Sequence, residues 1–196
     1  GSSNAVNLTD GLDGLAGGCL LFSIGAMGVV AYLAGQAELA QDLKLTPIPG
    51  SAEMAVLAGG IIGAVGGFLR FNCHPARVFM GDTGSLPLGG LLGLIAVVAR
   101  QEILLLVIAG PFVVEAASVI LQVGYYKWCR RRIFLCAPLH HHFQFRGSTE
   151  TRIVVRFWIA SALCAMLGLA ILNFDIHEPP VATAGLSSTA GAELSQ

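Results

Sequence analysis

Two asparagines and two aspartates stand close together near the start of the chain, interleaved with glycines and directly before a long apolar run. They are Asn4, Asn7, Asp10 and Asp13. Charges beside hydrocarbon are costly, so carboxylates kept there are better explained by a bound cation or a polar substrate than by stability. The neighbouring glycines allow a ligand to approach the backbone closely. The plainer alternative is that an aspartate caps the following helix, because Asn, Asp and Gly also favour turns.

A second polar motif occupies residues 71–85 and contains Asn72, Phe79 and Asp82. One interpretation is a loop that ends in an Asp or Ser helix cap before the next apolar run. A helix N-terminus also attracts phosphate, and an aspartate there can hold a hard cation against phosphate oxygens. The two uses are compatible. We expect His74, which stands before a proline, to be a loop residue rather than a ligand.

Three consecutive histidines, His140, His141 and His142, follow a run of arginines at 130–132. Adjacent histidines point in different directions, which argues against a three-ligand zinc site. Imidazoles near arginines suit phosphate oxygens, as hydrogen-bond donors and partial positive charges. A solvated basic loop would explain the arginines. It would not explain three histidines.

The remaining reactive groups are five cysteines and a carboxylate inside an apolar run. The cysteines form no C-x-x-C pair, and we expect reduced thiols without a disulfide. A zinc site built from Cys129, Cys136 and His140 is conceivable, but phosphate chemistry is the more coherent use of that region. The carboxylate is Glu115, for which a functional role and pairing with another helix are equal alternatives.

The composition indicates a membrane protein. The chain is 55% hydrophobic and 12% charged with a mean hydropathy of +0.73, whereas soluble domains carry about 25% charged residues. Crossing a bilayer takes about 20 apolar residues, so we expect an all-α, polytopic transmembrane bundle of about five helices. The predicted spans are 15–35, 54–69, 86–99, 103–126 and 153–172.

Gly110 and Pro111 should break the fourth of these helices. Proline removes a backbone donor and clashes with the preceding turn. A broken helix within a membrane usually serves a cavity or a site.

The basic residues predict the orientation of the bundle. With five crossings, nine of the 11 Lys and Arg fall on the side that holds residues 4–16. These nine are Arg70, Arg77, Lys127, Arg130, Arg131, Arg132, Arg146, Arg152 and Arg156. The positive-inside rule makes that side cytoplasmic, and all three polar motifs share it. A net charge of −1 without a basic domain gives no reason to expect nucleic acid as a partner.

Polar motifs gathered on one membrane face favour an enzyme that acts on a cytosolic compound. A transporter would need ionisable residues along a path through the bundle, and only Glu115 qualifies. A structural or assembly subunit would need no such cluster of motifs.

The segment 4–16, the tetrapeptide Phe79-Met80-Gly81-Asp82 and the histidine run together resemble the phospho-N-acetylmuramoyl-pentapeptide transferase family. The resemblance continues to about residue 172. Relatives that transfer N-acetylglucosamine-1-phosphate share the Asn/Asp segment in a looser form but usually carry a different histidine pattern. They remain the alternative within the enzyme class. Family members have further transmembrane helices, so the resemblance implies that residues 1–173 are the C-terminal half of a transferase domain, inactive alone, followed by a disordered tail at 174–196.

The resemblance also implies an activity and its partners. Undecaprenyl phosphate would attack UDP-N-acetylmuramoyl-pentapeptide at the bacterial cytoplasmic membrane and give lipid I and UMP for peptidoglycan synthesis. Magnesium would be the cofactor, membrane lipid a further partner, and a homodimer stays open.

Roles for individual residues follow from the same resemblance. Asp82 would be the magnesium ligand, Phe79 would stack on uracil and Asn72 would bond its edge. The catalytic group would comprise Asp82, His140, His141 and His142. The other substrate contacts would be Asn4, Asn7, Asp10 and Asp13.

Overall fold

The structure is a computed structural model that describes residues 1–43 and 45–174. This described part is helical without strands, which confirms the predicted all-α class. Four helices are long and apolar enough to cross a membrane, and a bent pair makes a fifth candidate. They are α2 (Leu15–Gly35), α4 (Glu53–Asn72), α5 (Gly81–Val98), α9 (Glu150–Phe174) and the pair α6 (Glu102–Ile108) and α7 (Gly110–Cys129). The predicted disordered tail lies outside the described residues, apart from Phe174, which ends α9.

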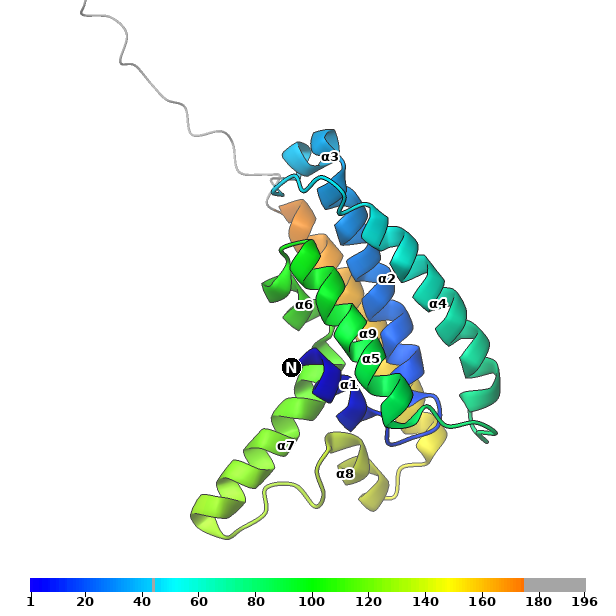
Figure 1. The fold of residues 1–196 in the computed structure, drawn as a ribbon. Helices are drawn as coiled ribbons and strands as arrows, with labels where there is room; N and C mark the ends of the chain where they lie inside the picture. The colour runs from blue at the N-terminus through cyan, green and yellow to red at the C-terminus, as the bar shows by residue number, and fades with distance from the viewer. Residues whose placement is uncertain (44, 175–196) are drawn as a thin grey trace, which may run out of the picture.

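Helix α2 forms the centre of the bundle and packs against α4, α5 and α9 (Figure 1). It is apolar on all sides, as expected of a helix that neighbours enclose. Leu20, Ile24 and Met27 are among its fully buried side chains. The outer helices expose apolar residues instead, such as Val56 on α4 and Leu163 on α9. That outward face suits lipid rather than water.

The predicted break at Gly110 and Pro111 is confirmed. Helices α6 and α7 meet there at 88°. Pro111 lies in the first turn of α7, where its missing N–H would have no helical partner. The bend directs α7 away from the bundle toward the end where α8 lies (Figure 1).

Three short helices were not predicted: α1 (Ser2–Thr9), α3 (Ala37–Asp42) and α8 (Leu139–Phe145). Isolated helices of this length are marginal, so their order comes from tertiary contacts. Helix α1 packs on α5 and α7, and α8 packs on α7 and α9.

Helix α5 starts at Gly81, before the predicted residue 86. Asp82 therefore lies within its first turn and is not the cap of a later helix. The carboxylate is still beside the free N–H groups of a helix start.

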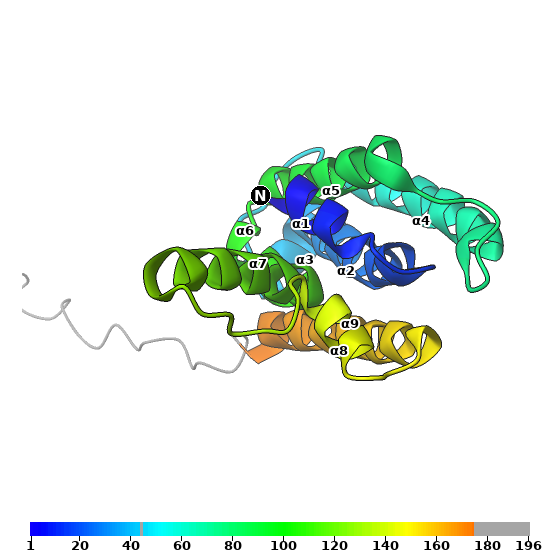
Figure 2. The same cartoon turned by 90° about the horizontal axis from the view of Figure 1, so that it is seen from below.

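The polar motifs meet at one end of the bundle. The start of α2, the end of α4 and the starts of α5 and α9 all lie there together with α8, while α3 lies at the opposite end (Figure 1). Figure 2 views the molecule from below, toward this end. The up-and-down path of the chain thus gathers segments that are far apart in sequence.

Candidate active site

Asn7 and Asp82 connect the first polar motif to the second. The Asn7 amide donates to Asp82 Oδ1 at 2.7 Å and to the Ser85 hydroxyl at 2.9 Å. The Ser85 hydroxyl donates to the Gly81 carbonyl at 2.9 Å. Asp82 is exposed in the first turn of α5, where the helix dipole favours negative charge. Helix α1 thus fixes the orientation of the Asp82 carboxylate through one side chain.

A pocket of about 170 Å³ opens beside this pair. Its lining residues are Asp10, Gly11, Leu12, Asp13, Asn72, Phe79, Met80 and Gly81. Burial raises the pKa of Asp10, a backbone hydrogen bond from Gly81 opposes this effect, and the negative charge of Asp82 adds to it. A cation between the two carboxylates would relieve their repulsion, and carboxylate oxygens are the ligands that Mg²⁺ prefers.

Phe79 and Asn72 contribute to the pocket wall in different ways, because one is exposed and the other is buried. Phe79 is 74% exposed, so its ring face is free to receive a flat group. Asn72 is buried, with its amide oxygen accepting from the Gly14 N–H at 3.1 Å and its NH₂ donating to the Val78 carbonyl at 2.9 Å. Each of these two atoms retains one further hydrogen-bonding site. Asn72 therefore holds the pocket together and keeps capacity for a ligand.

Gly14 has a positive φ of 76° at the start of α2, a conformation that glycine adopts without steric cost. Its N–H donates to Asn72 at the end of α4, and its carbonyl accepts from Trp158 Nε1 on α9 at 3.1 Å. One residue thus joins three helices beside the pocket.

Glu115 explains how the histidine segment becomes a helix. Its carboxylate accepts from the N–H groups of Leu139 at 2.7 Å and His140 at 3.1 Å, which are the first two residues of α8. It also lies 3.3 Å from His140 Nδ1. Of the two alternatives for Glu115, pairing with another helix is therefore the one that the structure contains, and the buried carboxyl group caps α8.

The three histidines face different partners. His140 is buried and its ring lies against Gly11, whose missing side chain permits this approach because a Cβ there would collide with Nε2. A ring nitrogen of His141 pairs with the Gln144 side-chain oxygen at 2.8 Å. His142 Nδ1 accepts from the Leu135 N–H at 3.2 Å. The third motif thus touches the first through His140.

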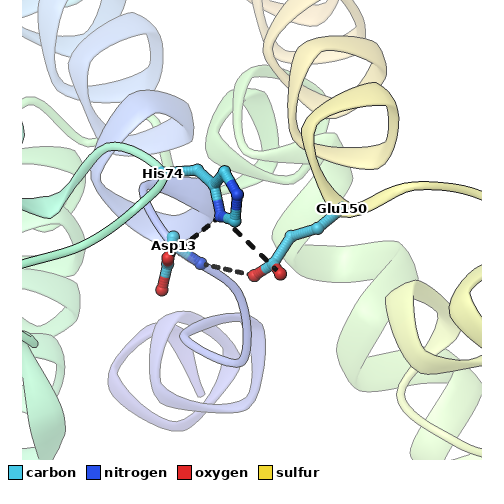
Figure 3. A group of neighbouring side chains, drawn as sticks. All are labelled: Asp13, His74 and Glu150. Carbon is cyan, nitrogen blue, oxygen red and sulfur yellow. Dashed lines mark hydrogen bonds and ion pairs between the residues drawn. The ribbon is translucent and has the colours of Figure 1, made fainter.

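His74 and Glu150 also lie at the site, and neither was predicted to belong to it. His74 is a loop residue, as predicted, but its Nδ1 lies 3.3 Å from Asp13 Oδ2 and 3.9 Å from Glu150 Oε2 (Figure 3). Glu150 stands in the first turn of α9, and its Oε1 accepts from the Asp13 N–H at 3.2 Å. Only its position, a carboxylate just before the last apolar span, could have drawn attention to it. Asn4 lies exposed on α1.

The bundle and its polar end define a membrane protein whose candidate site gathers carboxylates, an amide and an exposed aromatic ring around one pocket. The model of glycosyl transferase family 4 matches residues 1–100. A phospho-N-acetylmuramoyl-pentapeptide-transferase of Koribacter versatilis (strain Ellin345) is 55% identical over 173 residues, which are 88% of this chain and 46% of that relative. The chain belongs to glycosyl transferase family 4, and it spans about half the length of the curated relative.

Proposed function

We propose that the whole protein transfers phospho-N-acetylmuramoyl-pentapeptide from its UDP derivative to undecaprenyl phosphate. An oxygen of the lipid phosphate attacks the phosphorus attached to the sugar, the bond to the bridging oxygen breaks, and UMP leaves with that oxygen. The observation that carries the proposal is the convergence of Asn7 with Asp82, and of Gly11 with His140, at one end of the bundle. The 55% identity to a phospho-N-acetylmuramoyl-pentapeptide-transferase supports it.

The nucleotide is the substrate part that suits the pocket beside Asp10. Phe79 offers a ring face to uracil, and the remaining hydrogen-bonding sites of Asn72 suit its polar edge. Asp13 and Asp10 line the same pocket and are positioned for the hydroxyl groups of a ribose or sugar. Asn4, exposed on α1, remains a proposed outer contact.

Asp82 is the proposed magnesium ligand, and Asp10 is a neighbouring carboxyl group whose pKa is raised by burial and also by the charge of Asp82. Magnesium binding would neutralise the diphosphate and the leaving UMP. Asn7 keeps the Asp82 carboxylate oriented before the ion arrives, since its amide donates to Oδ1. The half-buried His141 and His142 are the proposed donors to the phosphates, and the buried His140 positions their helix.

An apolar pocket of about 290 Å³ supports a prenyl chain as the second substrate. It is lined by residues of α1, α5, α6 and α7, including Val6, Leu92 and Phe112. Because Asn7 follows Val6 on α1, a chain in this pocket would bring its phosphate toward the Asp82 end. We further propose that this end faces the cytoplasm of a bacterial inner membrane, since nine of the 11 Lys and Arg belong to it.

The test is magnesium-dependent UMP release in membranes that contain the chain together with the additional segment that its relative possesses. UDP-N-acetylmuramoyl-pentapeptide with undecaprenyl phosphate should yield UMP and lipid I. UDP-N-acetylglucosamine is the matched alternative substrate. Release from the latter alone would favour the N-acetylglucosamine-1-phosphate transferase class, and release from neither would contradict the proposal. Membranes that contain the chain alone show whether it is sufficient for UMP release.

A further inference from the structure

We propose that Asp13, His74 and Glu150 form a zinc site that is separate from the magnesium site at Asp82. The three residues come from different segments: the turn before α2, the loop after α4 and the first turn of α9 (Figure 3). One donor atom of each lies within 4.8 Å of the others.

The separations of the donor atoms suit a single ion. Zinc bonds of about 2.0–2.2 Å in a tetrahedron place neighbouring ligand atoms roughly 3.3–3.6 Å apart. His74 Nδ1 lies 3.3 Å from Asp13 Oδ2, within this range. Its separation of 3.9 Å from Glu150 Oε2 requires only a small side-chain rotation.

Backbone N–H groups orient both carboxylates toward the imidazole. The Ala76 N–H donates to Asp13 Oδ2 at 3.0 Å, and the Asp13 N–H donates to Glu150 Oε1 at 3.2 Å. The second bond leaves Oε2 of Glu150 for a cation. Ligand carboxylates are commonly held by outer hydrogen bonds of this kind. The side chain of His74 is 47% exposed, so water can reach the site and supply a fourth ligand.

The donor set distinguishes this group from the magnesium site. One imidazole nitrogen and two carboxylate oxygens suit zinc, whereas magnesium prefers oxygen ligands and retained water. A simpler arrangement has the His74 N–H donate to Asp13 without a metal. That arrangement leaves two carboxylates facing one imidazole, while an ion would neutralise both and tie α9 to the turn before α2.

Zinc titration of the protein in detergent tests the proposal. The sample carries no polyhistidine tag, and its five unpaired cysteines are replaced by serine because thiolates also bind zinc. Calorimetry should find one saturable site, and zinc should raise the midpoint of thermal unfolding. His74→Ala and Glu150→Gln should each weaken binding about tenfold or more.

Asp82→Asn is the matched control, and it should bind zinc like the parent. Equal binding by His74→Ala and the parent would overturn the proposal, and so would loss of binding in Asp82→Asn, which would locate zinc at the magnesium site. If the cysteine-free protein does not fold, zinc titration of the protein with native cysteines gives the comparison as the difference between His74→Ala and the parent, because the five thiols are common to both. Absence of zinc binding would leave the proposed transferase function standing, because that function is tested by magnesium-dependent UMP release.

Discussion

The Glu115 carboxylate lies 3.3 Å from Nδ1 of His140, and both side chains are buried. The same carboxylate accepts the first two backbone N–H groups of α8. Glu115 is on α7, directly after the break, so the bend and the histidine helix are connected through one residue. The position of all three histidines thus depends on a carboxylate that is distant in sequence.

Replacing Glu115 should therefore destabilise the protein. We expect Glu115→Ala to lower the free energy of unfolding by about 2–4 kcal/mol, because two backbone N–H groups at the start of α8, one of them buried, lose their acceptor. Glu115→Gln keeps one acceptor oxygen and should lose less. Reversible unfolding in mixed detergent micelles measures both. Ile120→Ala, on the exposed face of α7, is the control, and an unchanged Glu115→Ala variant would show that α8 forms without this cap.

Gly11→Ala should displace His140. The added methyl group would collide with the imidazole, and such overpacking costs about 1–3 kcal/mol. We expect lower thermal stability and a loss of UMP release. Gly90→Ala is the matched control, because a Cβ at Gly90 meets open space in the middle of α5. Similar behaviour of the two variants would mean that the approach of Gly11 to His140 has no role.

The histidine variants should separate into two groups. His140→Ala removes a buried ring and should lower both stability and turnover. His141→Ala and His142→Ala should lower turnover by about 10²-fold or more with little change in unfolding, since their proposed work is donation to phosphate. Turnover and thermal unfolding of the same samples provide the comparison. Full activity of both His141→Ala and His142→Ala would show that this segment has no catalytic role.

Asp82→Asn should preserve the fold and remove most magnesium-dependent turnover. The substitution keeps a side-chain oxygen for Asn7 but removes the negative charge that would hold the ion. Rates measured across a magnesium series give the result. Thr83→Ala, at the next exposed position of α5, is the control. Near-parental turnover of Asp82→Asn at low magnesium would eliminate Asp82 as the ligand.

The orientation of the bundle is testable by cysteine labelling in a cysteine-free background. Glu38→Cys, on α3, should react with a membrane-impermeant reagent added outside intact cells, and Arg146→Cys, after α8, should not. The expectation follows from the basic residues around α8. The reverse labelling pattern would move the site to the outer face and remove access to a cytosolic nucleotide.

Sequence patterns predicted correctly those elements whose structure is determined by local physical chemistry. The apolar run at 15–35 coincides with α2, and Pro111 marks the break between α6 and α7. Helix α8 was not predictable, since its cap is supplied by Glu115 from another helix. Neither was the approach of His74 and Glu150 to Asp13, because no sequence spacing encodes which helix ends become neighbours.

The roles of individual residues were likewise predictable only in part. The sequence pointed to Asn7 and Asp82 separately, but only the fold joins them through a hydrogen bond. Asn72 was expected to face the substrate, and the structure adds that its amide also ties Gly14 to Val78. Its contact with uracil remains a prediction.

Gly14 connects the wall of the pocket to α9. Its N–H donates to Asn72 in the wall of the pocket, and its carbonyl accepts from Trp158 on α9. A ligand that displaces Asn72 would therefore also affect the hydrogen bond between Gly14 and Trp158, and with it the contact of α2 with α9. Occupancy of the pocket and the tilt of α9 would then be coupled.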